Sequence, residues 1–337
     1  MKILQIVNPI LPFPVKTIGG TERIVQYMIE ELLKHGHEIT LMGHDESIAP
    51  SNVNFIPIGA YHDQKNTAKK VWKHLLFNKY DVIHNHGRLI YFLPEIWSKA
   101  KKIHTFHMAE IRSNSFMNFF KLKPQNLILT PCAKWIQNKN DDLPGNWKFV
   151  NHGIPINKYS LGTTVINNES PLIIICRIGL GKGVLDAIEI AKKANKNLII
   201  AGKAGDNQHE KEWFNNTFLK HCDGKQIQYI GEIDDLKKQE LLAKSLGLLM
   251  LSIDLEAFNL TMLEANACGC PVLSYNRYFP PDFIKNGING FIGDNQKELI
   301  QKVELLYTID RKECRKEFET HYTSAIMVNN YLKLYTQ

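Results

Sequence analysis

The segment at residues 246–271, LGLLMLSIDLEAFNLTMLEANACGCP, restricts the possible folds of this chain more than any other. Its apolar run at residues 248–251 predicts a buried strand, and residues 258–268 have the composition of a helix that ends near Gly269 and Pro271. Because ligands in open α/β sheets bind beyond the carboxyl ends of the strands, the loop between this strand and helix is expected to face a binding site.

Two carboxylates flank this junction, Glu256 in the loop and Glu264 within the predicted helix. A helix start offers unpaired N–H groups to an anion, and a carboxylate can accept two hydroxyl hydrogen bonds at once. Most glutamates are solvated surface residues. Glu264, however, lies among Leu263, Ala265 and Ala267 in a helix expected to be largely buried, where a carboxylate needs partners. The junction is therefore typical of a site for a ligand that carries phosphate and hydroxyl groups.

The first half of the chain alternates strand-like runs with helical segments. The strand-like runs lie at residues 2–8, 38–42, 81–84, 102–106 and 127–130. Such alternation predicts a parallel sheet with crossover helices. A polar segment at 157–170 is interpreted as a linker, and the same alternation restarts at residue 172. A length of 337 residues suits two domains, each with its own core.

A glycine pair follows the first predicted strand, in the segment 17–23, TIGGTER. Gly19 and Gly20 would let the backbone approach a ligand closely, and Thr21 is expected to cap a helix that begins at Glu22. A pair of glycines on its own is also common in ordinary turns. Its place at the end of a strand favours a binding loop.

A second glycine-rich segment, RIGLGKG at residues 177–183, lies between the first strand and helix of the second half. This order suits a phosphate cradle, for which Arg177 and Lys182 would supply the positive charge. A solvated turn is the alternative, since the segment lacks the Walker pattern and falls short of the full dinucleotide fingerprint.

Histidines cluster at the ends of two further predicted strands. His84 and His86 follow one strand, and His104 and His107 follow the next. We expect His84 and His104 to cap their strands or to pair with a backbone carbonyl. Because the four histidines do not have a spacing diagnostic of a metal site, no metal is expected here.

The pattern EAFNLTMLEANACGCPV resembles a motif of the retaining nucleotide-sugar glycosyltransferases of family 4, in the group similar to glycogen synthases and mannosyltransferases. The resemblance continues through the glycine pair, the TFH segment that ends at His107, the NHGIP segment at 151–155 and the RIGLGKG turn. It implies a GT-B fold, in which two Rossmann-like α/β domains with parallel sheets face a central cleft.

The same resemblance implies boundaries for the domains. Residues 1–163 would form the acceptor-side domain and residues 164–321 the nucleotide-sugar domain, while a terminal helix in residues 322–337 would cross back to the first domain. Two departures from the family pattern concern sugar recognition. Asn259 stands where relatives usually have glycine, and Asp282 is the only acid in residues 275–283, where relatives usually carry a glutamate.

The resemblance also implies roles for individual residues. The catalytic candidates are His107, Glu256, Arg177 and Lys182. The donor-binding candidates are Gly19, Gly20, Gly231, Phe258, Asn259, Leu260 and Glu264. On the acceptor side the candidates are His86 and Arg112.

These assignments imply a retaining hexosyltransferase that needs no metal or other cofactor. It would move a hexose-type sugar from a nucleotide sugar, with UDP favoured over GDP, to a glycan, a lipid-linked acceptor or another surface-polysaccharide acceptor. Two alternatives use the same fold. One is a protein that binds or senses a nucleotide sugar without transferring it, and the other is an epimerase-like enzyme that isomerises the sugar.

The net charge of +7 is concentrated in the first half, where residues 1–163 carry a net charge of +8. This asymmetry favours an acidic partner such as a phosphorylated acceptor or an anionic lipid surface, although a solvated lysine-rich surface is the alternative. Nucleic acid is not expected, because no basic and aromatic module pattern is present. Six scattered cysteines and an N-terminus without a signal-peptide cleavage site suggest free thiols in the bacterial cytoplasm, with peripheral contact at the inner face of the membrane.

Overall fold

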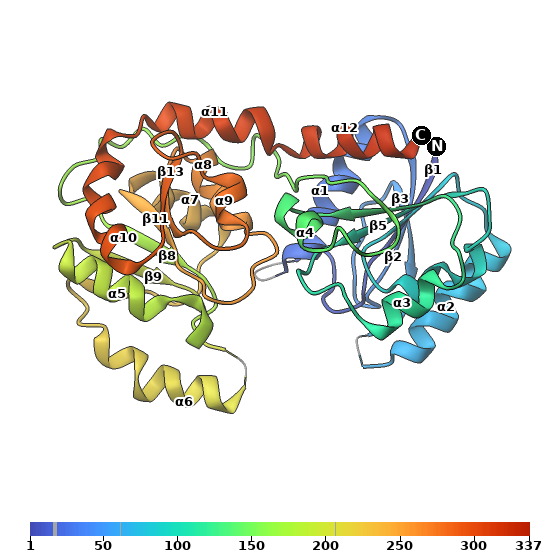
Figure 1. Cartoon of the computed structure of the whole chain (residues 1–337), viewed down its shortest axis with the longest axis horizontal. Helices are drawn as coiled ribbons and strands as arrows, with labels where there is room; N and C mark the ends of the chain where they lie inside the picture. Colours follow the sequence, from blue (N-terminus) through green and yellow to red (C-terminus); the bar gives the residue numbers. More distant parts are fainter. Residues whose placement is uncertain (16–18, 61, 206) are drawn as a thin grey trace. The chain divides into compact units, whose positions relative to one another are not determined.

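A computed structural model of the chain describes residues 1–15, 19–60, 62–205 and 207–337. The chain divides into two compact units, one formed by Met1–Pro155 with Thr323–Gln337 and the other by Ile156–Tyr322 (Figure 1). Each unit is built around a parallel β-sheet with helices packed on it, so the predicted α/β class is confirmed.

The first unit contains a seven-stranded sheet in the order β3-β2-β1-β4-β5-β6-β7. Its strands are β1 (Lys2–Ile6), β2 (Glu38–Gly43), β3 (Val53–Pro57), β4 (Val82–Asn85), β5 (Lys101–Phe106), β6 (Leu127–Pro131) and β7 (Asn146–Trp147). Its helices are α1 (Gly20–Lys34), α2 (Gln64–Phe77), η1 (Leu89–Glu95), α3 (Asn114–Phe120), α4 (Lys134–Lys139) and α12 (Ser324–Tyr335). The central strands are buried on both faces, which explains their nearly continuous apolar sequences.

The second unit contains a six-stranded sheet in the order β10-β9-β8-β11-β12-β13. Its strands are β8 (Leu172–Ile175), β9 (Leu198–Ala201), β10 (Ile227–Tyr229), β11 (Gly247–Met250), β12 (Val272–Tyr275) and β13 (Gly290–Gly293). Its helices are η2 (Leu180–Lys182), α5 (Val184–Lys193), α6 (Gln208–Asn216), η3 (Phe218–His221), α7 (Asp235–Lys244), α8 (Leu260–Ala267), α9 (Pro280–Phe283), α10 (Gln296–Val303), η4 (Glu304–Thr308) and α11 (Arg311–His321).

In both sheets the strand order reverses beside the first strand of the unit. β1 lies between β2 and β4, and β8 lies between β9 and β11, with parallel pairing throughout these contacts. The chain leaves such neighbouring strands in opposite directions, which opens a crevice beyond their carboxyl ends. Each unit therefore has one favoured place for a ligand.

The junction predicted in residues 246–271 is confirmed as β11, a loop and α8. The helix begins at Leu260, two residues later than expected, because the side chain of Asn259 accepts a hydrogen bond from the Thr261 N–H and caps the helix. The other expected cap is wrong. α1 begins at Gly20 with Gly19 at the N-cap position, and no cap side chain accepts a hydrogen bond there, so Thr21 lies inside the helix.

The segment interpreted as a linker packs closely on the second unit, which begins at Ile156, before the boundary that we placed at residue 163. Tyr159 is only 1% exposed, and its hydroxyl donates to Glu264 Oε1 at 2.9 Å. The Arg315 guanidinium donates to the carbonyls of Ile156, Tyr159 and Ala267. These contacts join the start of the second unit to helices that lie 105 to 159 residues further along the chain.

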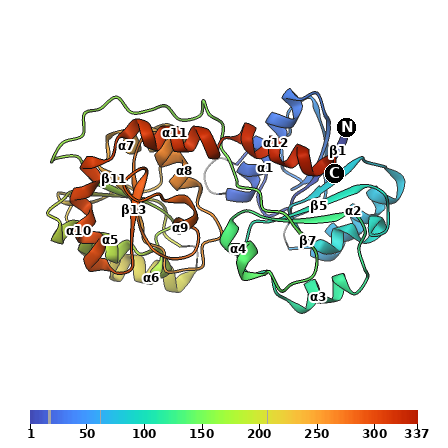
Figure 2. The same ribbon diagram turned by 45° about the horizontal axis from the view of Figure 1, so that its top comes forward.

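The C-terminal helix α12 packs beside α1 in the first unit (Figures 1 and 2). The Tyr335 hydroxyl lies 2.6 Å from His84 Nδ1, and His84 Nε2 lies 2.8 Å from Thr105 Oγ1. The Tyr331 hydroxyl contacts Thr105 Oγ1 at 2.9 Å. His84 therefore joins its strand to the last helix and to β5, and our expectation that it caps its strand or pairs with a backbone carbonyl is wrong.

Burial keeps five histidines of the first unit neutral. His84, His86, His104 and His152 are at most 5% exposed, and His107 is partly exposed. Burial lowers the pKa of all five below the usual value, to about 3 for His104 and His107.

Acid is expected to destabilise the first unit before most carboxylates titrate. Below pH 6.5 the unfolded chain binds protons at these histidines and the folded chain does not, so the free energy of unfolding falls as the pH falls towards the folded pKa values. Each histidine contributes up to about 1.4 kcal/mol per pH unit in this window. Urea unfolding between pH 7.5 and 5, followed by tryptophan fluorescence, measures the effect, since four of the five tryptophans lie in this unit.

Replacing the buried His104 by glutamine should reduce the pH dependence. The matched control is His209→Gln, because His209 is exposed on α6 of the second unit. An unfolding free energy that stays constant between pH 7.5 and 5 would contradict the assignment of neutral buried histidines.

Candidate functional site

In the second unit the glycine-rich turn after β8 packs directly against the loop after β11. The carbonyl of Gly181 accepts hydrogen bonds from the N–H groups of Ile253 and Asp254, and a Cβ atom at Gly181 would collide with the Asp254 carboxylate. Gly183 has a φ of 70°, and a Cβ atom there would collide with the carbonyl of Leu251. The glycines are needed because two loops approach each other closely at the end of the sheet.

This approach places Lys182 between two carboxylates. Its Nζ lies 2.6 Å from Glu256 Oε1 and 3.4 Å from Asp254 Oδ2. Burial lowers the pKa of Lys182, but the two carboxylates outweigh this effect and raise the pKa above its ordinary value. Lys182 is therefore a fully charged ammonium at neutral pH, held in one position by its neighbours.

A pocket of about 160 Å³ lies beyond the carboxyl ends of β8 and β11. Its polar lining is Arg177, Lys182, Ser252, Glu256, Asn259 and Thr261. Ligand sites are usually about 300–1,000 Å³, so this pocket has room for a phosphate-sized part of a larger ligand. The Arg177 guanidinium, 40% exposed, forms an ion pair with Glu210 of α6.

The remaining donor-side candidates of the second unit lie on loops around this pocket and after β10. Asn259 caps α8 at the pocket wall, Leu260 is the first residue of that helix, and Phe258 packs on Phe279 with ring centroids 4.2 Å apart. Gly231 has a φ of 76°, its carbonyl accepts from the Gly202 N–H, and the space where its Cβ would point is open.

Glu264 is buried, as the sequence predicts, but its partners lie far away in the sequence. Tyr159 donates to Oε1, and Lys238 Nζ of α7 lies 2.9 Å from Oε2. Lys238 also lies 3.3 Å from Asp235 Oδ1. The carboxylate is thus held rigidly at 3% exposure, outside the lining of the phosphate-sized pocket.

In the first unit a chain of contacts connects three polar side chains near the ends of β1, β4 and β5 with a fourth in the segment after β7. Gln5 Oε1 lies 2.8 Å from His86 Nε2, His86 Nδ1 lies 3.0 Å from His107 Nε2, and His107 Nδ1 lies 3.1 Å from His152 Nε2. Both ring nitrogens of His107 are therefore engaged by other histidines. Each ring nitrogen that accepts forces its partner to donate, so the tautomers along the chain are coupled.

His86 and His107 line a larger pocket of about 590 Å³. The apolar lining comes mainly from Ile10, Leu89, Ile90, Leu93, Met108, Ile111, Phe116, Phe119 and Leu122. Glu22 of α1 also lines it, and burial raises the pKa of this carboxyl. Glu110 and His104 line it as well, so this pocket combines an apolar wall with two carboxyl groups and three neutral imidazoles.

Gly19, Gly20 and Arg112 have different surroundings. A Cβ atom at Gly19 would collide with Val15, whereas the space beside Gly20 is open. Arg112 is 60% exposed and forms an ion pair with Asp142 instead of lining the pocket of His86. Lys16, Thr17 and Ile18, which precede the glycine pair, lie outside the described residues.

The sequence did not identify Asp254, Lys238, Tyr159 or Glu22 as site residues. Asp254 lies two residues before Glu256, and Glu22 lies in the glycine segment. Their closeness to predicted site residues could therefore have identified both from the sequence. Lys238 and Tyr159 offered no such signal, because only the folded chain brings them to Glu264.

Three further findings concern the cysteines, possible metal sites and possible membrane-spanning helices. All six cysteines are free thiols, as predicted. Within the described ranges, no group of three or more His, Cys, Asp or Glu side chains is arranged to hold a metal ion. Each helix in the described part of the chain is too short or too polar to cross a membrane.

Comparison with known proteins finds relatives across both units. The family model "Glycosyltransferase Family 4" matches residues 18–141, and the model "Glycosyl transferases group 1" matches residues 164–320. An uncharacterised 41.2 kDa protein in the cps region of Klebsiella pneumoniae is 22% identical over 297 residues, which is 78% of this chain and 80% of that protein.

Two solved structures share the fold over the full length of this chain. Sucrose-phosphate synthase from Thermosynechococcus elongatus has a TM-score of 0.80 at 15% identity and is covered to 98%. HepE from Anabaena, in complex with UDP and glucose, has a TM-score of 0.79 at 14% identity and is covered completely. The two family matches and the shared fold lead to one conclusion: this chain is a glycosyltransferase of family 4 with the GT-B fold.

Proposed function

We propose that this glycosyltransferase moves a hexose-type sugar from a nucleotide sugar to a glycan or lipid-linked acceptor of a surface polysaccharide. The donor is a UDP-sugar in preference to a GDP-sugar, and the transfer retains the configuration at the anomeric carbon. The proposal rests on the position of the Lys182 ammonium, which Asp254 and Glu256 hold in place beside Arg177. These groups lie where the strand order of the second sheet reverses. This array suits a diphosphate.

The departing nucleoside diphosphate gains negative charge as the bond to the sugar breaks. Lys182 has three N–H donors and uses two of them on its carboxylate partners, so one remains for a phosphate oxygen. Arg177 and the start of α8 lie at the same pocket and add further positive potential. Because these groups are in place before the donor binds, they stabilise the developing charge without reorganisation.

In the proposed step the bond between the anomeric carbon and the diphosphate oxygen breaks, and a bond to the acceptor oxygen forms on the same face. The departing phosphate oxygen takes the proton of the acceptor hydroxyl. Within the second unit, Glu256 is proposed to position the sugar. The roles expected for His107, Gly19 and Gly20 of the first unit stay predictions. No metal ion takes part, since Arg177 and Lys182 supply the positive charge.

Replacing Lys182 by glutamine should lower kcat/KM for the nucleotide sugar by about 100-fold or more, because one preorganised charged donor is lost. Release of UDP from a UDP-hexose measures the rate, and the wild-type rate should be unchanged in EDTA. The matched control is Lys192→Gln, which removes an exposed lysine from α5. A variant that keeps wild-type kcat/KM and a wild-type melting temperature would disprove the role of Lys182.

The nucleoside end of the donor is proposed to bind at Glu264. Its Oε1 accepts from one hydroxyl, that of Tyr159, and a carboxylate oxygen can accept a second hydrogen bond from a ribose hydroxyl. Lys238 Nζ, 2.9 Å from Oε2, holds the carboxylate in position. The preference for UDP draws on the complex of HepE with UDP, a protein that shares the fold.

Replacing Glu264 by glutamine should weaken UDP binding about tenfold, since the amide accepts more weakly than a carboxylate. Isothermal titration with UDP and with GDP measures both the loss and the preference for UDP. Glu240→Gln on α7 is the control, because Glu240 is exposed and pairs only with exposed lysines among the described residues. UDP affinity equal to that of the wild type, or tighter binding of GDP, would contradict the corresponding part of the proposal.

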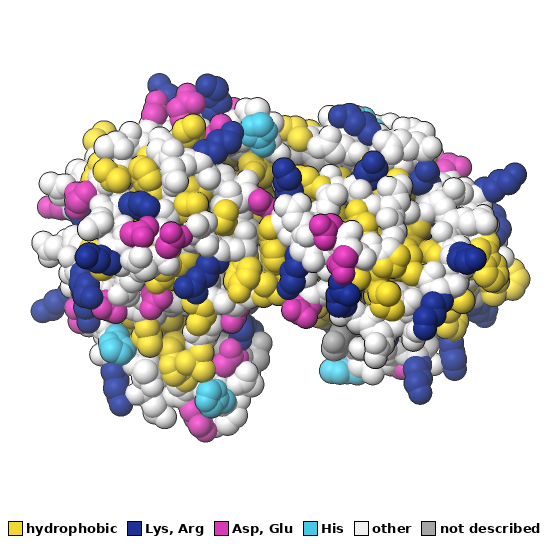
Figure 3. Space-filling model, in the orientation of Figure 1, with side chains coloured by type: hydrophobic (Ala, Val, Ile, Leu, Met, Phe, Trp, Pro, Cys, Tyr) yellow, Lys and Arg dark blue, Asp and Glu magenta, His cyan; other side chains and the backbone are white. Residues whose placement is uncertain are grey.

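The acceptor is proposed to reach the first unit from a membrane surface. Trp97 is 64% exposed and donates to the carbonyl of Leu122, which is 42% exposed. Lys121 and Lys123 flank Leu122 in the sequence. Figure 3 shows many Lys and Arg side chains beside hydrophobic ones on the visible face of this unit. Exposed aromatic and cationic side chains together suit the interface of an anionic membrane.

The double variant Trp97→Gln with Lys121→Gln should bind less to vesicles of phosphatidylglycerol and phosphatidylcholine than the wild type. Flotation at low salt measures binding, and Leu236→Gln, which removes an 80% exposed leucine of the second unit, is the control. A wild-type chain that does not float with these vesicles would refute the membrane contact.

A further inference from the structure

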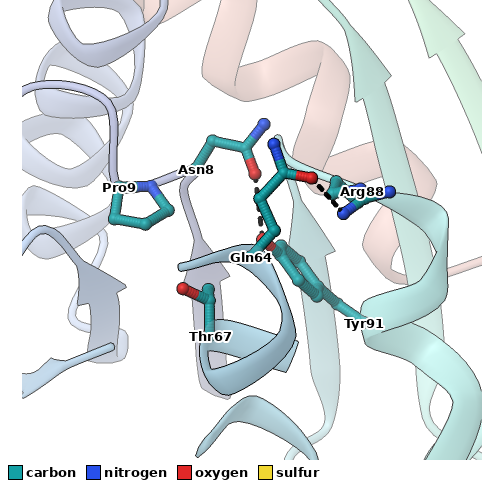
Figure 4. Close-up of a pocket in the computed structure, with 6 residues that line it drawn as sticks. All are labelled: Asn8, Pro9, Gln64, Thr67, Arg88 and Tyr91. Atoms are coloured by element: carbon teal, nitrogen blue, oxygen red, sulfur yellow. Dashed lines mark hydrogen bonds between the residues drawn. The ribbon is translucent and has the colours of Figure 1, made fainter. Parts of the chain in front are cut away.

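A second pocket lies beside the histidine chain in the first unit, and none of the sequence patterns pointed to it. It measures about 290 Å³ and is lined by Asn8, Pro9, Gln64, Thr67, Arg88 and Tyr91 (Figure 4). Asn8 follows β1, Arg88 follows β4, and Gln64 and Thr67 belong to the first turn of α2. The pocket thus lies beyond the carboxyl ends of β1 and β4, where the strand order of this sheet reverses.

The side-chain amide oxygens that line the pocket already accept hydrogen bonds from other lining residues. The Tyr91 hydroxyl donates to Asn8 Oδ1 at 3.0 Å, and Arg88 Nη1 donates to Gln64 Oε1 at 2.6 Å (Figure 4). Both amide oxygens are therefore used, whereas the amide NH2 groups of Asn8 and Gln64 have no acceptor among the described residues. The guanidinium of Arg88 likewise has donors to spare, since it has five N–H groups.

Thr67 adds a hydroxyl that the protein leaves unsatisfied. This residue is 1% exposed, and its Oγ1 has no hydrogen-bond partner among the residues described. Leaving a buried polar group unpaired is unfavourable, so this hydroxyl needs a partner from outside the chain, which a water or a ligand in the pocket would supply.

The pocket also contains no carboxylate. Its six lining residues include one cation and no acid, and Arg88 forms no ion pair with a described residue. Asp63, which directly precedes the lining residue Gln64, caps α2 instead. Its carboxylate accepts hydrogen bonds from the backbone and the side chain of Asn66. The first turn of a 14-residue helix adds positive potential here. A surplus of donors without an acid suits an anion better than a neutral sugar, whose hydroxyl groups also need acceptors.

The polar pocket adjoins the larger apolar one, because Asn8 and Arg88 line both. A ligand held at Arg88 therefore extends towards His86 and His107, which lie in the larger pocket. We propose that the polar pocket binds the carboxylate or phosphate of an acidic sugar in the acceptor. This inference rests on the proposed function for the acceptor, and it identifies the chemistry by which the first unit selects that acceptor.

The test uses ligand-observed NMR on the full chain with three probes: glucuronic acid, glucose 6-phosphate and glucose. At least one acid should bind about tenfold more tightly than glucose, and the tighter of the two acids identifies the group that is recognised. Arg88→Gln should weaken binding of that acid about tenfold, because a charged donor is lost. Lys73→Gln, an equal change of charge at an exposed position of α2 outside the pocket, should leave the affinity unchanged.

Thr67→Val separates a binding role from a structural one. The isosteric change removes an unsatisfied hydroxyl, so the melting temperature should hold or rise while affinity for the acid falls. The proposal is overturned if glucose binds as tightly as both acids, or if Arg88→Gln and Thr67→Val both keep the wild-type affinity for the acids.

UDP titrated into the same samples distinguishes this proposal from the proposed function. Binding of UDP without either acid would overturn the acidic subsite alone. Binding of an acid without UDP would support the subsite and count against the proposed donor site.

Discussion

The reversal of strand order in two parallel sheets is the constraint on which the pockets of this protein depend. Neighbouring strands that send the chain to opposite sides cannot close the space beyond their carboxyl ends. In the first unit this occurs between β1 and β4, and in the second between β8 and β11. The polar pocket of Arg88 and the pocket of Lys182 lie at these two points. The strand order gives both pockets their position, although the segments that line them are not similar in sequence.

Charged groups in the second unit are held in place by partners before any ligand arrives. A buried charge without a partner costs several kcal/mol, so a half-buried lysine is stable only beside carboxylates. Asp254 and Glu256 meet this need for Lys182, and Lys238 meets it for Glu264. The first unit uses another solution, in which burial keeps five histidines neutral and hydrogen bonds engage both ring nitrogens of His86 and His107.

Much of the fold and part of the site could be predicted from local patterns. Apolar runs and helix-forming segments alternate with the correct spacing, and the junction of β11 and α8 appears within two residues of its predicted position. Glu264 could be identified as a buried carboxylate because its own neighbours in the helix are apolar. Other expectations were wrong where contacts between segments far apart in the sequence determine the local structure. Thr21 does not cap α1, and His84 binds Tyr335 of the last helix instead of capping its strand.

The sequence by itself determined the α/β class, the glycine turns and the acids and bases available to a sugar-nucleotide site, because periodicity and residue type act over a few neighbours. Only the tertiary structure decided which groups meet. It joined Tyr159 and Lys238 to Glu264, and it assembled the donors of Asn8, Gln64 and Arg88 from three separate segments. Contacts of this kind depend on how strands order themselves in a sheet, and no local pattern along the chain encodes that order.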